Sequence, residues 1–236
     1  MFLVSLYNEI IYRPLLNLLV YFYHYIPDIG VVIVLLTILI RLLMAPSFHK
    51  SLKSQKAMTE LQPKLNEVKE KYKDDKEGQA RAMMQLYKDH QINPLSSCLP
   101  LLVQFPILIA LYQVFSKALN NHLTGLYAFV PKPETINPFF LHLMDLSKPS
   151  IVLGVLAGLA QFWQSKMMLP KTSAASQDAT TKAIQMQTTY FLPIVSVVIA
   201  IKLPAGLPLY WLVTTLFAVG QQYWLVKRQQ PQAPRS

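Results

Sequence analysis

Five long apolar stretches dominate the pattern of hydrophobic and polar positions along the chain. Each is long enough to be a transmembrane helix, because about 20 apolar residues at a rise of about 1.5 Å per residue cross the hydrocarbon core of a bilayer. The predicted spans are 28–46, 96–118, 150–170, 184–203 and 207–226. Only Pro204, Ala205 and Gly206 separate the last two spans, so these form a tight hairpin. The pattern predicts an all-α polytopic membrane protein with five transmembrane helices.

More polar segments precede, connect and follow the spans. They are 1–27, 47–95, 119–149, 171–183 and 227–236. The first is apolar and aromatic but contains Glu9, Arg13 and Pro14. We interpret it as an amphipathic helix in the membrane interface, where its tyrosines suit the headgroup level. A sixth span is the alternative, and it would move only the N-terminus to the other side.

Basic residues orient the predicted spans. The sequence has 22 Lys and Arg against 12 Asp and Glu, a net charge of +10. Sixteen of the basic residues lie on the side of the polar segment 47–95, five lie on the other side, and Arg41 lies inside a span. An excess of Lys and Arg marks the cytoplasmic side of a membrane protein. The N-terminus is therefore expected outside, and the C-terminus, with its basic tail 227–236, in the cytoplasm.

Composition excludes several other classes of protein. The chain is 53% hydrophobic and only 14% charged, whereas soluble domains carry about 25% charged residues. This apolar content also excludes a disordered chain. Cys98 is the single cysteine, so a scaffold of intrachain disulfides is impossible.

The polar segment 47–95 is predicted to be a cytoplasmic coiled-coil hairpin of two helices. Apolar residues at alternating spacings of three and four form one narrow seam on the first helix. They are Met58, Leu61, Leu65, Val68 and Tyr72. The segment 73–78 ends this helix, a second helix carries Ala80, Met83 and Tyr87 on one face, and Pro63 is expected to kink the first. The many charges are either solvated faces of the hairpin or a docking surface for anionic lipid, RNA or a protein partner.

Arg41 lies inside the first predicted span, where a central charge costs at least about 2.5–3.5 kcal/mol to insert. One interpretation is that its long side chain reaches the cytoplasmic headgroups, because Pro46 is only five residues away. The other is a wet, positively charged cavity that other spans line with amides and hydroxyls, although each such group is also a common helix-packing residue. The candidate lining residues are Thr37, Gln104, Gln161, Gln164, Tyr210, Thr214 and Gln221.

Several functions lack the residues that they need. None of the twelve acidic residues lies in the interior of a predicted span, and Asp28 lies just at the edge of the first, so Arg41 has no membrane carboxylate as a partner and ion-coupled transport is disfavoured. Motifs for zinc or serine hydrolysis and for ATP binding are absent, and the histidines show no metal-ligand spacing. An unpaired Arg in a cavity therefore needs an anion from elsewhere. A client polypeptide with a hydrophilic tail is the simplest source.

Several sequence segments resemble the YidC/Oxa/Alb membrane insertases, in order, from about residue 10 to 228. They include Leu36-Thr37-Ile38-Leu39-Ile40-Arg41-Leu42-Leu43-Met44-Ala45-Pro46, Leu61-Gln62-Pro63-Lys64, Lys71-Tyr72-Lys73-Asp74-Asp75, Asn93-Pro94-Leu95-Ser96-Ser97-Cys98-Leu99-Pro100, and Leu203-Pro204-Ala205-Gly206-Leu207-Pro208-Leu209-Tyr210-Trp211. Further matches are Phe129, 136–145 and Leu146 in the outer loop, and 164–167 in the third span. The short basic tail departs from family members in which longer tails dock to the ribosome.

The resemblance implies a five-helix core around a hydrophilic groove that opens to the cytoplasm and to lipid. Arg41 would receive the hydrophilic part of a client, and Tyr210 and Trp211 would line the path of its transmembrane segment. The hairpin, with Pro63, Lys64, Tyr72, Asp74 and Asp75 as its matching residues, would contact clients or partners. Such a protein is an insertase in the bacterial plasma (inner) membrane, without covalent chemistry, ATP hydrolysis, metal or cofactor. Its implied partners are newly made membrane proteins, lipids, the Sec translocon and the ribosome, but not DNA.

Two other functions stay open at the level of sequence. A small-solute channel or carrier is one, although the chain has neither inverted repeats nor membrane carboxylates. A chaperone that assembles membrane proteins only together with the Sec translocon is the other. Gly154 and Gly158 form a G-x-x-x-G pattern in the third span, which allows another helix to approach closely.

Overall fold

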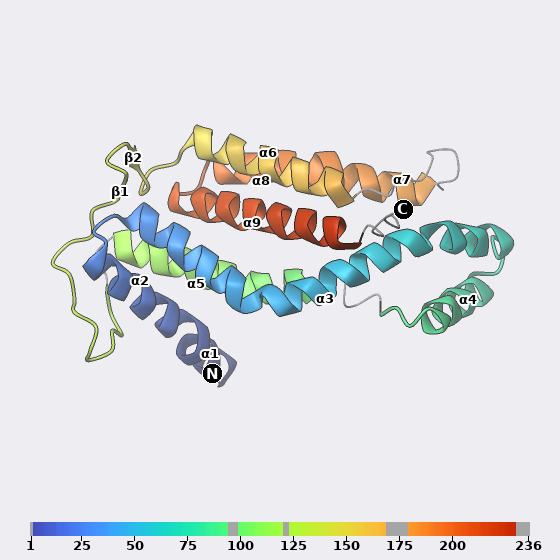
Figure 1. Ribbon diagram of the computed structural model, residues 1–236, viewed down its shortest axis with the longest axis horizontal. Helices are drawn as coiled ribbons and strands as arrows, with labels where there is room; N and C mark the ends of the chain where they lie inside the picture. The colour runs from blue at the N-terminus through green and yellow to red at the C-terminus, as the bar shows by residue number, and fades with distance from the viewer. Residues whose placement is uncertain (1, 94–98, 120–122, 169–178, 230–236) are drawn as a thin grey trace, which may run out of the picture.

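The computed structural model describes residues 2–93, 99–119, 123–168 and 179–229, and Figure 1 shows that helices dominate it. The predominantly helical fold predicted from the apolar pattern is thus confirmed. In chain order the elements are α1 (Phe2–Tyr7), a π-helical turn (Asn8–Tyr12), α2 (Arg13–Tyr25), α3 (Ile29–Lys71), α4 (Lys76–Asp89), α5 (Leu99–Leu119), β1 (Phe139–Phe140), β2 (Met144–Asp145), α6 (Ile151–Met168), α7 (Ala179–Met186), a second π-helical turn (Gln187–Phe191), α8 (Leu192–Ala200) and α9 (Gly206–Gln229). The motif residues 94–98 and the end of the basic tail, 230–236, lie outside the described residues.

The longest element is α3, and it continues beyond the predicted first span. The helix has 43 residues and runs through both Pro46 and Pro63. Where the membrane span within it ends stays a prediction. A proline removes one backbone hydrogen bond, and the bonds before and after it hold the helix together. Within the described residues, α3 is the one helix long and apolar enough to cross a bilayer, with a window of mean hydropathy 2.6. The count of five spans stays a prediction.

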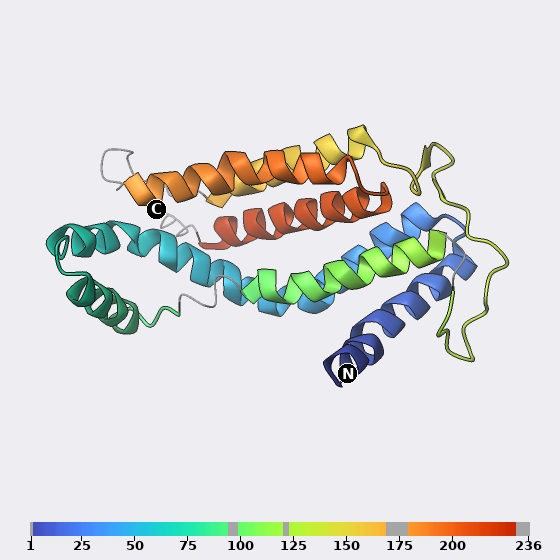
Figure 2. The same cartoon turned by 180° about the vertical axis from the view of Figure 1, so that it is seen from behind.

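The helices form an elongated bundle. In Figures 1 and 2, α9 lies between α3 on one side and the pair α6 and α8 on the other, and α5 runs beside the first half of α3. The helical segment α1–α2 crosses this bundle at an angle and packs on α3 and α5. The second half of α3 extends away from the bundle and folds back through α4.

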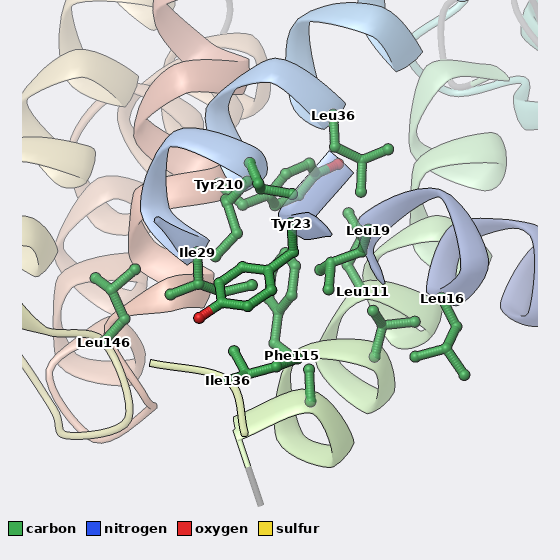
Figure 3. Packing of buried hydrophobic residues seen from close by; sticks show 14 of the residues in the cluster. Leu16, Leu19, Tyr23, Ile29, Leu36, Leu111, Phe115, Ile136, Leu146 and Tyr210 are labelled. Carbon is green, nitrogen blue, oxygen red and sulfur yellow. The ribbon is translucent and has the colours of Figure 1, made fainter. Parts of the chain in front are cut away.

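A hydrophobic core joins the helix α2, the first half of α3, and helices α5 and α9. Leu16 and Leu19 of α2, Leu36 of α3 and Leu111 of α5 are almost completely buried in it, and Figure 3 shows their side chains together with that of Tyr210. The segment 1–27, predicted as an interfacial helix, therefore packs one face of α2 firmly against the bundle. Its position relative to a bilayer stays a prediction.

The hairpin at the far end pairs α4 with the second half of α3. Leu61 and Leu65, two residues of the predicted seam, are buried. Asp75 caps α4 by accepting a hydrogen bond from the Gly78 N–H at 2.9 Å. Lys64 lies 2.9 Å from the imidazole of His90, which follows α4. Of the other predicted contact residues, Pro63 lies inside α3, Tyr72 ends that helix and Asp74 is exposed in the connecting turn.

The connection 119–149, predicted as an extracytoplasmic loop, contains a short β-hairpin. Strand β1 pairs antiparallel with β2, so that Phe139 lies opposite Asp145 and Phe140 opposite Met144. Asp28 fixes this hairpin to the start of α3: one carboxylate oxygen accepts the N–H of Val31 at 3.0 Å, and the other accepts the N–H of Leu141 at 2.6 Å. One side chain therefore both caps α3 and holds the β-hairpin.

Asp28→Ala is expected to lower the free energy of unfolding by about 1–2 kcal/mol, because it removes a helix cap and leaves the Leu141 N–H without its acceptor. Asp28→Asn is the matched control, since its side-chain oxygen still caps the helix. Unfolding of the purified protein in detergent measures both variants. Equal stability of wild type and Asp28→Ala would contradict this double role.

Candidate functional site

Arg41 is buried between α3 and α9. Only 6% of its surface is exposed, and its Nε donates a hydrogen bond to Oγ1 of Thr214 at 3.2 Å. Its Cζ lies 4.3 Å from the centre of the Phe48 ring, an arrangement that favours a cation–π interaction. Its Nη1 is buried and has no hydrogen-bond partner among the described residues. The guanidinium is thus held from two sides and keeps an unused donor.

A chain of polar side chains connects Arg41 to a third helix. Tyr210, one turn before Thr214 on α9, is only 1% exposed, and its hydroxyl accepts a hydrogen bond from Nε2 of Gln104 on α5. Tyr210 and Thr214 lie one turn apart on the same face of α9. We call Arg41, Phe48, Gln104, Tyr210 and Thr214 the Arg41 cluster. It brings four predicted site residues from three helices together.

Thr37 takes a different role from the one expected. It lies one turn before Arg41 and is only 2% exposed. Its hydroxyl donates to the carbonyl oxygen of Ile33 in its own helix at 2.6 Å. Such a bond satisfies a Thr side chain inside a helix without a second helix. The Thr37 hydroxyl is therefore satisfied within α3, and no hydrogen bond between described residues joins it to the Arg41 cluster.

The structure does not join the two predicted glutamines of the third span to this cluster. Gln161 and Gln164 are half-buried on α6, which packs on α8 and α9. No hydrogen bond between described residues connects either amide with Arg41. Trp211 is half-buried and packs against the hydrophobic core rather than against the guanidinium. Of the predicted site residues, four thus belong to the Arg41 cluster. The others, Thr37, Gln161, Gln164 and Trp211, lie outside it.

Further buried polar groups, of which the sequence analysis named only Gln221, lie between α3 and the end of α9. The ring of His49 on α3 lies 5.5 Å from that of Trp224. His49 Nδ1 and the Oε1 atoms of Gln221 and Gln222 are buried without a hydrogen-bond partner in the described part of the chain. Spacing alone indicates Gln221, which follows Thr214 by two helical turns. Phe48 and His49 were assigned to the hairpin because the first span was predicted to end at Pro46.

The chemistry available in the Arg41 cluster is the binding of an anion. A guanidinium offers donors in a planar fork and stays protonated at neutral pH. The described residues contain no group of three or more His, Cys, Asp or Glu side chains that could hold a metal ion. A carboxylate or a row of carbonyl oxygens matches the unused Nη1 donor.

Thr214→Val tests whether the Thr214 hydroxyl positions Arg41. Valine keeps the shape of threonine but removes the acceptor of the 3.2 Å hydrogen bond, so we expect Arg41-dependent activity to fall several-fold, for a loss of about 1 kcal/mol. Thr214→Ser keeps the hydroxyl and is the matched control. The measurement is the insertion assay with an acidic client described below. Equal activity of the Val and Ser variants would exclude this role.

The chain matches a known protein family over most of its length. The family model described as 60Kd inner membrane protein matches residues 21–232. A membrane protein insertase YidC from Pelobacter propionicus is 38% identical over 222 residues, which are 92% of this chain and 39% of that protein. A membrane protein insertase YidC from Nitratidesulfovibrio vulgaris is 37% identical over 218 residues, 92% of this chain and 38% of that protein. The chain therefore spans about two fifths of the length of these curated relatives.

The fold also matches a solved structure. A crystal structure described as an active YidC insertase with the first transmembrane domain resolved superimposes with a TM-score of 0.62 at 26% sequence identity. The match covers 92% of this chain and 46% of that one. The overall fold is thus similar to that of a protein described as an active YidC insertase.

Proposed function

This chain belongs to the 60Kd inner membrane protein family, and from that membership we propose that it inserts newly made proteins into the membrane. The observation that carries the proposal is the Arg41 guanidinium, buried between α3 and α9 with Nη1 unused. A buried charge without a counterion is costly, so its presence inside a helix bundle indicates a function. The function proposed for Arg41 is to bind the hydrophilic tail of a client.

Insertion on this mechanism needs neither ATP nor a cofactor. A client span of about 20 apolar residues is more stable in lipid than in water, so the barrier lies in moving its polar tail across the bilayer. A tail carboxylate loses hydration when it leaves water. A charge-assisted hydrogen bond to Arg41 in a hydrated groove offsets part of that free-energy cost. The apolar segment then moves along α9, past Tyr210 and Trp211, into lipid.

The proposed arrangement in the membrane has five spans. They comprise the first part of α3, helix α5, helix α6, the combined segment α7–α8, and α9, with the β-hairpin end outside and α4 in the cytoplasm. The charge asymmetry of the sequence supports this orientation. A groove beside Arg41 would open to the cytoplasm and to lipid. The segment 1–27 would lie in the outer interface.

The partners follow from the same mechanism. Membrane proteins without bulky translocated domains are the proposed clients, and lipid is the second contact. The basic α3–α4 hairpin, with Pro63, Lys64, Tyr72, Asp74 and Asp75, is the proposed surface for clients, the Sec translocon or the ribosome. The proposed location is the bacterial inner membrane.

Reconstitution tests this function. The purified protein is placed in otherwise protein-free vesicles with a single-span client, and protection of the client's tail from added protease is scored. We expect protection above that in empty vesicles. If the tail stays accessible but becomes protected once Sec components are added, the protein acts only as a Sec-dependent chaperone. A flux of small solutes without protected tails would favour the channel or carrier instead.

A further inference from the structure

The β-hairpin between α5 and α6 presents an apolar tip whose function the insertion mechanism leaves unexplained. Two of its three turn residues are leucines, Leu141 and Leu143, with 54% and 86% of their surface exposed. Flanking Phe139 is 42% exposed. Large apolar side chains gathered at one exposed turn are typical of a contact surface for a membrane or a protein.

The backbone holds this tip in a defined conformation. The N–H of Leu143 donates to the carbonyl oxygen of Phe140 at 2.9 Å and closes the turn. Leu141 and His142 adopt positive φ angles of 51° and 61°, which are rare for residues other than glycine. Such a conformation persists only where its surroundings impose it. The leucines are therefore displayed outward by a fixed turn.

The base of the hairpin is anchored beside the first turn of α3. The Phe140 side chain packs against Gly30 so closely that a Cβ atom at position 30 would overlap the ring. Asp28, directly before α3, accepts the N–H of Leu141 at 2.6 Å. The base of the hairpin thus lies at the level where α3 begins.

The residues that follow the hairpin lead to an exposed apolar surface at the start of α6. The N–H of Ala205 donates to the carbonyl oxygen of Lys148 at 2.9 Å, so the residues after β2 lie against the turn between α8 and α9. Helix α6 then begins with Ile151 and Val152, which are 71% and 61% exposed. Figure 1 shows the hairpin next to this start of α6. In a membrane protein, such an exposed apolar helix face is covered by lipid.

We infer that Leu141 and Leu143 insert into the outer leaflet of the membrane and anchor this end of the bundle. We assign lipid acyl chains to the apolar tip, because Leu141 lies beside the start of α3 and the hairpin leads into the exposed apolar start of α6. The exposed Lys148 and Lys202 nearby suit the phosphate level. This anchoring requires the proposed membrane orientation but not the proposed insertase activity.

Spin labels measure the depth of the tip directly. In a Cys98→Ala background, Leu143→Cys is labelled in vesicles of phosphatidylethanolamine and phosphatidylglycerol without other proteins. Glu134→Cys, in the same connection, is the aqueous reference, and Leu156→Cys, exposed on α6, is the lipid reference. We expect the label at Leu143 to collide more with oxygen and less with a water-soluble nickel complex than the label at Glu134. Equal accessibility at Leu143 and Glu134 would overturn the inference.

A second variant tests the anchor of the hairpin, and dilution with unlabelled protein tests whether a second copy of the chain covers the tip. Gly30→Val should displace Phe140 and move the Leu143 label toward water, while the Leu156 label keeps its depth. A label that stays in lipid would overturn the anchoring role of Gly30 and Phe140. If a second copy of the chain covered the tip, spin–spin broadening would appear and vanish on dilution with unlabelled protein, which would also overturn the lipid assignment. Because depth is read without a client, a failed insertion assay leaves this test intact.

Discussion

Arg41→Ala is expected to reduce insertion of clients with acidic tails by about tenfold or more, since a hydrogen bond to a charged group contributes about 1.5–3 kcal/mol and 1.4 kcal/mol is a factor of ten. The guanidinium is the buried charge of the cluster, and its Nη1 has no hydrogen-bond partner in the described part of the chain. Tail protection in vesicles measures the loss. Clients with uncharged tails should be affected less.

Arg41→Lys is the matched variant, because it keeps the charge and loses the planar fork. We expect it to retain much of the activity, since charge rather than bidentate geometry is required. Lysine would lose both the Thr214 bond made by Nε and the stacking on Phe48. A Lys variant that folds normally but inserts no better than Arg41→Ala would contradict a mechanism based on charge.

Gly158→Val is expected to lower the free energy of unfolding by about 1–3 kcal/mol, the usual cost of overpacking. A Cβ at Gly158 would overlap Cγ2 of Val197 and lie 3.3 Å from the carbonyl oxygen of Pro193, so α6 and α8 would have to separate. At Gly154, one turn earlier, a Cβ would lie 2.8 Å from Cγ2 of Ile201. The G-x-x-x-G pattern thus marks the close approach of α8.

Gly220→Val is the control for this prediction. It places the same residue in the interior of a helix, but nothing lies within 4 Å of a Cβ at position 220. Both variants share the backbone and propensity effects of replacing glycine, so their difference isolates packing. Thermal unfolding in detergent is the measurement. If the two variants were equally stable, the α6–α8 contact would not be the reason for Gly158.

Sequence reasoning predicted the elements that depend on strong local patterns. The apolar stretches indicated the helices, and the charge in one of them indicated Arg41. The predicted first span ends at Pro46, whereas the helix itself continues through that proline. Phe48 and His49 were therefore assigned to the hairpin, although they lie on the continuation of α3 beside the end of α9. The β-hairpin was missed because its strands are only two residues long.

The polar site was only partly predicted, because polarity along the sequence does not show which residues meet in the fold. Polarity inside an apolar stretch indicated Gln104, Tyr210 and Thr214, and the fold brings them to Arg41. The same signal also selected Thr37, whose hydroxyl bonds to its own helix, and Gln161 on α6. Which of two polar residues reaches a common site depends on how the helices rotate and pack. A single sequence without contacts does not contain that information.

Crosslinking from position 48 tests most directly whether a client tail reaches Arg41. Photoreactive benzoylphenylalanine replaces Phe48, whose ring centre lies 4.3 Å from the guanidinium carbon, and in a control protein replaces Phe191, which is 58% exposed on the α7–α8 segment. The expected result is that the acidic tail of a stalled single-span client crosslinks to position 48, not to position 191, and that Arg41→Ala abolishes this crosslink. Crosslinks of equal strength from both positions, or a position 48 crosslink that survives Arg41→Ala, would contradict tail reception by the Arg41 cluster.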